Sequence, residues 1–105
     1  MQRNDPVLRK CRIVLGDTYG ERLKEVILYG SCARGSETLE SDIDLLVLLE
    51  GPVNVALEIR CIWDALYPVQ LESDRVISVL PADVANYRAG DYALYRNVLA
   101  EGVPI

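Results

Sequence analysis

The chain has 105 residues, half of them apolar, which is enough to build a hydrophobic core and predicts one domain over residues 1–105. Its 16 acidic and 11 basic residues give a net charge of −5. Proteins that track nucleic acid usually present a basic surface, so DNA or RNA is disfavoured as a direct partner, whereas a small nucleotide is still compatible with this charge.

The first half of the chain is predicted to form one helix followed by two strands. Asp5 and Pro6 suit the first positions of a helix, and Val7, Cys11 and Val14 then follow at helical spacing. We expect this helix to end within 16–20 and a strand to follow over 26–29, ended by Gly30. A stretch of small residues over 31–41 should contain one helical turn, and a buried strand is expected over 43–49.

The second half is predicted to add two helices and a third strand. Apolar residues recur at helical spacing from residue 55 to residue 66, and Pro68 is expected to end that helix. A strand is expected over 75–80 with Pro81 after it, and a last helix over about 91–100 with Gly102 as its stop. Alternation of this kind indicates an α/β fold, a small mixed β-sheet packed with helices.

Several functional classes are excluded by missing residues. The chain has no histidine, so it holds no Ser–His–Asp triad and no zinc site that contains histidine. Any metal must be bound mainly by carboxylate and carbonyl oxygens, which suit Mg²⁺. Three cysteines without a C-x-x-C spacing are typical of reduced thiols in a cytoplasmic protein. No apolar run reaches the roughly 18 residues of a membrane-spanning helix.

The segment that carries chemistry begins where the strand over 26–29 ends. Gly30 lets the backbone approach a ligand closely, and Ser31 offers a hydroxyl and a backbone N–H to a phosphate oxygen. Arg34 can place its guanidinium on a phosphate. Asp42 and Asp44 are two residues apart at the start of the next strand, so their side chains share one face, with Cα atoms about 6–7 Å apart.

Two carboxylates so close together disfavour folding unless a cation compensates them, and together they can converge on one or two Mg²⁺ ions. A glycine–serine turn or an Asp-x-Asp pair is by itself usually only a turn or a solvated strand end. The combination of both, each attached to a strand, favours a site for a nucleoside triphosphate and Mg²⁺.

The pattern Gly-Ser-x-Ala-Arg-Gly at 30–35 followed by Ser-Asp-Ile-Asp-Leu-Leu-Val at 41–47 resembles the signature of the DNA polymerase beta-like nucleotidyltransferase superfamily. It is most similar to minimal nucleotidyltransferase (MNT) domains, which are often the antitoxins of HEPN–MNT toxin–antitoxin pairs. The specific resemblance covers about residues 26–49, and the general layout covers nearly the whole chain.

The resemblance implies a role for each matching residue. Gly30 and Ser31, helped by Arg34, would bind the triphosphate, while Asp42 and Asp44 would be the catalytic pair that binds Mg²⁺. The implied reaction transfers AMP from ATP to a hydroxyl, namely a tyrosine of a HEPN toxin partner. The chain has no room for the second domain of larger relatives, so a separate subunit or a homo-oligomer would have to complete the acceptor site.

The sequence departs from the superfamily in one respect, because a third carboxylate on a later strand is not evident. Ser78 or Val76 occupies the corresponding position, and Asp74 would lie about 13 Å from Ser78 along the strand. Asp74 is therefore only a weak candidate for a metal ligand. The alternative hypothesis is a catalytically impaired, nucleotide-binding antitoxin that neutralises its partner by contact alone; a plain structural module without nucleotide is a third.

Overall fold

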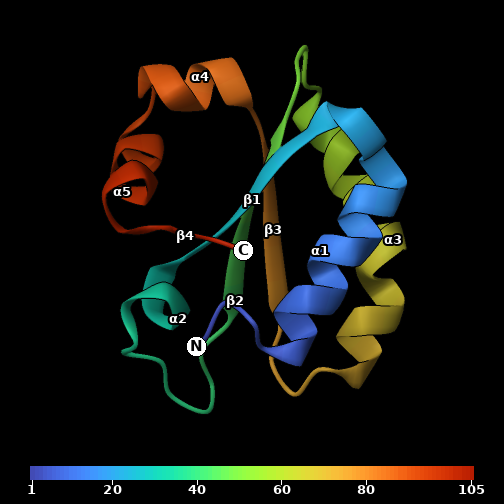
Figure 1. Cartoon of the computed structure of the whole chain (residues 1–105), viewed down its shortest axis with the longest axis vertical. Coiled ribbons are helices and arrows are strands. Elements are labelled where there is room, and N and C mark those ends of the chain that lie inside the picture. The colour runs from blue at the N-terminus through green and yellow to red at the C-terminus, as the bar shows by residue number, and fades with distance from the viewer.

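A computed structural model describes residues 1–105 and contains a four-stranded sheet with helices on both faces (Figure 1). None of its helices is long and apolar enough to cross a lipid bilayer. The elements in chain order are α1 (Pro6–Tyr19), the 3₁₀ turn η1 (Gly20–Arg22), β1 (Leu23–Tyr29), α2 (Gly30–Arg34), β2 (Ile43–Leu49), α3 (Val55–Glu72), β3 (Ile77–Asp83), α4 (Val84–Ala89), α5 (Ala93–Glu101) and β4 (Val103–Pro104).

The sheet is mixed, with the strand order β3-β2-β1-β4. Strand β1 runs antiparallel to β2 and to β4, whereas β2 and β3 are parallel and are connected through α3. The register sets Tyr29 of β1 opposite Asp44 of β2, and Asp44 opposite Ser78 of β3. The predicted fold class, a small mixed sheet packed with helices, is confirmed.

Each face of the sheet has its own hydrophobic cluster. Helices α1 and α3 cover one face, and α4 and α5 lie over the other (Figure 1). In β2, Leu45 and Val47 belong to the first cluster, whereas Leu46 and Leu48 belong to the second. Because side chains alternate along a strand, Asp44 lies on the same face as Leu46, which is the face of α4 and α5.

Two proline boundaries predicted from the sequence are wrong. Helix α3 continues through Pro68 to Glu72, although proline removes one intrahelical hydrogen bond. Leu66 and Val69 are buried on either side of Pro68, so packing of the apolar face holds the helix together across the defect. Strand β3 runs through Pro81, which is tolerated because β3 is an edge strand.

Three short elements were not predicted: η1, α4 and β4. Helix α4 begins after Asp83, whose carboxylate accepts a hydrogen bond from the Ala85 N–H at 2.8 Å. Strand β4 follows Gly102, where a Cβ atom would lie 2.6 Å from the Ile27 side chain. Only glycine lets the chain pass so close to β1. Gly102 is thus the predicted end of the last helix and also the entry to β4.

Candidate active site

The turn between β1 and α2 is built around Gly30. Its φ of 73° lies in the left-handed region, which favours glycine. A Cβ atom on Gly30 would lie 2.5 Å from Oδ2 of Asp44, closer than a real contact allows. The backbone of Gly30 therefore packs directly against the Asp44 carboxylate, and the two halves of the sequence motif meet at this point.

Helix α2 is closed by a second glycine and tied to the strand that follows. Gly35 has a φ of 74°, and its N–H donates to the carbonyl of Ser31, which also accepts from the N–H of Ser36 at 3.1 Å. The buried Cys32 donates its Sγ–H to the carbonyl of Asp42 at 3.3 Å. This contact fixes α2, with Ser31 in its first turn, against the residue that enters β2.

Arg75 holds the loop that precedes Asp42. Its Nη1 donates to the carbonyl of Thr38 at 2.5 Å and to that of Ser41 at 3.0 Å. The Thr38 N–H donates in turn to the Ser41 hydroxyl at 2.9 Å. From the sequence, Arg75 is expected in a strand, and its positioning role is not predicted, because no local pattern links it to a loop 34 residues earlier in the chain.

Asp42 and Asp44 are close enough to influence each other. Asp44 is half-buried and Asp42 is exposed. Burial, and after it the charge of Asp42, raises the pKa of the Asp44 carboxyl above its ordinary value. Burial and the charge of Asp44 likewise raise the pKa of the Tyr29 hydroxyl.

No cation of the chain compensates this pair, since neither aspartate takes part in any of the five ion pairs. Two uncompensated carboxylates beside a backbone turn form a donor set that suits a hard divalent cation such as Mg²⁺.

A third acidic ligand does not join this pair. No three His, Cys, Asp or Glu side chains are grouped as a metal site would require. Asp74 is exposed in the bend between α3 and β3, and the neighbour of Asp44 on β3 is Ser78. The structure thus brings Gly30, Asp42 and Asp44 together and leaves Asp74 outside the group.

A pocket of about 320 Å³ opens beside the Gly30 turn. One wall comes from the end of β1 and from α2, and the other comes from α5, whose contribution the sequence analysis did not predict. Arg34 is exposed at this pocket, and its Nη1 lies 3.7 Å from Glu101 Oε2. The lining residues are Tyr29, Gly30, Arg34, Leu94, Asn97, Val98 and Glu101.

The mixture of apolar, amide and cationic groups at this pocket can bind a small molecule that has an apolar ring system and a charged tail. Gly30, which lines this pocket, also packs against the Asp44 carboxylate. A pocket, a glycine turn and paired carboxylates on one face of a mixed sheet are the parts that a phosphoryl-transfer domain needs.

Comparisons with known proteins agree with this geometry. The chain matches the family model described as "Nucleotidyltransferase domain" over residues 8–89. It is 30% identical over 88 residues to a protein of Methanocaldococcus jannaschii named "putative protein adenylyltransferase", a match that covers 84% of this chain and 83% of that protein. A second protein with that name from the same organism is 49% identical over 41 residues, which is 39% of each chain.

One solved structure shares the fold. It is described as a toxin–antitoxin with AMP-PNP, and it superposes with a TM-score of 0.66 at 21% sequence identity, over 91% of this chain and 69% of that one. Together with the family match, these findings show that the chain belongs to the nucleotidyltransferase domain family.

Proposed function

We propose that the chain is a Mg²⁺-dependent nucleotidyltransferase that transfers AMP from ATP to a hydroxyl group of a partner protein. Gly30 and Ser31, with Arg34, bind the triphosphate, and Asp42 and Asp44 are the catalytic pair that holds Mg²⁺. The observation that carries the proposal is the direct packing of the Gly30 backbone on the Asp44 carboxylate. A phosphate held at the turn then lies beside the metal ligands.

The chemistry follows from this arrangement. Mg²⁺, when bound, supplies the positive charge that neutralises the phosphates. The α2 turn presents backbone N–H groups to phosphate oxygens, and the pocket against α5 holds the nucleoside. The acceptor oxygen attacks the α-phosphorus in line and gives its proton to water. A new P–O bond forms, the bond from the α-phosphorus to the oxygen that bridges it to the β-phosphate breaks, and pyrophosphate leaves.

The partner that we propose is a toxin of the HEPN class, modified on a tyrosine, so that the chain acts as an antitoxin in the cytoplasm. This extends what the names of the relatives say of those proteins. The exposed face of α3 supports a protein partner, or a second copy of the chain in a homo-oligomer. Three large apolar side chains spaced four residues apart lie on it, 40–69% exposed: Trp63, Tyr67 and Leu71.

The test is labelling of the cognate partner. The chain is incubated with Mg²⁺, α-labelled ATP and the partner, and label should move to the partner only when Mg²⁺ is present. Asp44→Asn should abolish labelling, whereas Asp74→Asn, at an exposed carboxylate outside the site, is the matched control and should keep it. Absence of label with every nucleoside triphosphate, under conditions where nucleotide binds, contradicts the proposal.

A second candidate function is favoured by the missing third carboxylate. With Ser78 beside Asp44 on β3, the chain would bind nucleotide without transferring it and would neutralise its partner by contact. A folded Asp42→Asn/Asp44→Asn double variant separates the two candidates. Neutralisation by this variant supports the contact mechanism, and its loss supports the enzyme.

A further inference from the structure

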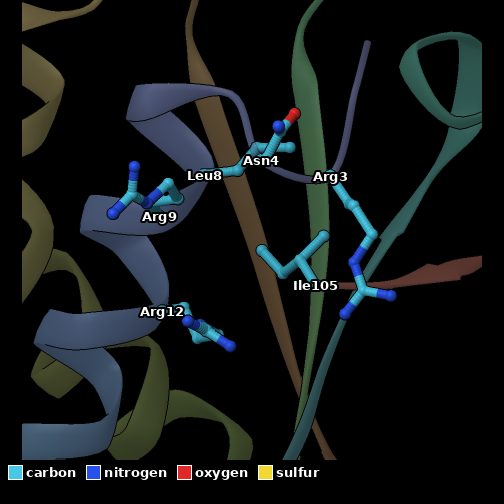
Figure 2. A pocket seen from close by; sticks show the side chains of 6 residues that line it. All are labelled: Arg3, Asn4, Leu8, Arg9, Arg12 and Ile105. Carbon is cyan, nitrogen blue, oxygen red and sulfur yellow. The ribbon is translucent and has the colours of Figure 1, made fainter.

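A second cavity, of about 170 Å³, lies between the N-terminal segment, the first turns of α1 and the residue that follows β4 (Figure 2). Figure 2 shows Arg3 on one side of Ile105 and Arg12 of α1 on the other side, whereas the guanidinium of Arg9 is turned outward from α1. The cavity shares no residue with the pocket beside Gly30. Its lining residues are Arg3, Asn4, Leu8, Arg9, Arg12 and Ile105.

The arginines of this cavity have no partners within the chain. Ion pairs occupy four of the eleven basic side chains, and hydrogen bonds to carbonyl groups occupy two more. Five arginines make neither contact, and three of those five, Arg3, Arg9 and Arg12, line this one cavity. The other two are Arg60 on α3 and Arg88 on α4.

This clustering is unexpected in an acidic protein. The first twelve residues hold four basic groups and one acidic group, Asp5, although the whole chain has a net charge of −5. Asp5 is already engaged, because its Oδ1 accepts the N–H of Val7 at 3.0 Å as the cap of α1. Like charges placed together without compensation oppose folding, so a bound anion would relieve their repulsion.

We propose that the Arg3–Arg9–Arg12 cavity binds the phosphate group of a small ligand, such as inorganic phosphate, pyrophosphate or a phosphate ester. Phosphate suits the cavity better than a single carboxylate, because it carries more charge and more acceptor oxygens for guanidinium groups. The cavity volume greatly exceeds the roughly 30 Å³ that one water occupies in the liquid. The buried Leu8 contributes an apolar wall to the cavity.

A small ligand fits the charge distribution better than nucleic acid does. A nucleic-acid strand needs a basic track along its backbone, whereas residues 13–105 hold seven basic and fifteen acidic side chains. The positive charge is therefore confined to one place that can hold one or two phosphate groups. This inference does not depend on the transfer reaction proposed above.

The test is a residue-resolved NMR titration of the whole chain with phosphate and with pyrophosphate, at constant ionic strength and with a chelator that removes Mg²⁺. Binding in the cavity should give saturable shifts at the Nε–H groups of Arg3 and Arg12 and at the methyl groups of Leu8. Shifts that are absent for both anions, or that spread evenly over all basic residues, overturn the proposal.

Two double variants with the same change in net charge provide the control. Arg3→Ala/Arg12→Ala should raise the Kd for pyrophosphate at least about tenfold, because it removes two charge-assisted contacts. Arg60→Ala/Arg88→Ala removes two equally unpartnered arginines that do not line the cavity and should leave the Kd unchanged. Equal Kd values for the two variants contradict the proposal.

The last arm of the experiment is a titration with a short single-stranded RNA. It distinguishes a small phosphate ligand from the phosphates of a nucleic-acid backbone. If RNA binds more tightly than pyrophosphate and loses affinity steeply with salt, the cavity belongs to a nucleic-acid surface and the small-ligand proposal is wrong. A preference for phosphate over pyrophosphate limits the ligand to a single phosphate group and supports the proposal.

Discussion

Replacing Gly30 with alanine tests the central contact of the candidate active site, and Gly35 provides a matched control. Both glycines have a left-handed φ, 73° and 74°. A Cβ at Gly30 would lie 2.5 Å from Asp44 Oδ2, whereas a Cβ at Gly35 would have no atom within 4 Å. The two substitutions therefore share the backbone strain and differ only in the collision with Asp44.

The backbone strain of a left-handed alanine is about 1–2 kcal/mol, and the smaller entropy of the unfolded chain offsets roughly 0.4–1 kcal/mol of it. Gly35→Ala should thus lower the free energy of unfolding by about 1 kcal/mol. Gly30→Ala should lower it by a further amount of about 1–3 kcal/mol, because the Asp44 carboxylate or helix α2 has to move. For a chain of this size each kilocalorie corresponds to a Tm change of about 4–8 °C.

The decisive assay is calorimetric titration of each folded variant with Mg²⁺ and a non-hydrolysable ATP analogue. We expect Gly35→Ala to bind almost as the unmodified chain does. Gly30→Ala should bind at least about tenfold more weakly, because it displaces the carboxylate that we propose as a metal ligand. If both variants bind the nucleotide equally well, the argument that Gly30 and Asp44 form one site is refuted.

Three further substitutions test other features of the structure. Because the pKa of Asp44 is raised in the folded state, the unfolded chain loses the Asp44 proton at a lower pH than the folded chain does. The free energy of unfolding therefore falls as pH rises from the ordinary aspartate pKa of about 3.9 to the folded-state pKa of Asp44. Asp44→Asn should remove this loss and make the metal-free chain more stable at pH 7 in urea denaturation, and a variant less stable than the unmodified chain would contradict the electrostatic interpretation. Arg75→Ala removes the two hydrogen bonds that hold the loop before Asp42. It should lower the free energy of unfolding by about 1–2 kcal/mol and weaken nucleotide binding in calorimetry. The control is Arg88→Ala, at an exposed arginine, which should change neither stability nor binding. Pro68→Ala restores the donor that α3 lacks and should raise the free energy of unfolding by about 1–2 kcal/mol in chemical denaturation, so a loss of stability would show that the proline ring itself is needed.

The sequence predicted the parts of the fold that depend on local periodicity. The strand over 43–49 and the start of α1 after Asp5 agree with the structure, because a continuous apolar run and a helix cap are local signals. The end of α3 was mispredicted, because Leu66 and Val69 pack against the sheet strongly enough to carry the helix past Pro68. Such packing is a tertiary effect that local propensity does not contain.

In the candidate site too, the features that depend on local sequence were predicted, and those that depend on tertiary contacts were missed. Gly30, Asp42 and Asp44 were found because residue type and strand parity are visible in the sequence. The roles of Arg75 and of the α5 wall were missed, since both depend on contacts between segments far apart in the chain. The separation of Asp74 from the aspartate pair agrees with the distance of about 13 Å along the strand that the sequence predicts between Asp74 and Ser78.

The position of α5 has a consequence for when the chain becomes competent during synthesis. The motif residues lie in the first half of the chain, but one wall of the pocket beside Gly30 comes from Leu94 to Glu101. A ribosome that has released only the part up to α4 presents both aspartates without a place for the nucleoside. Under the proposed function, nucleotide capture would begin only after α5 has been translated, and a chain that ends before α5 would not consume ATP.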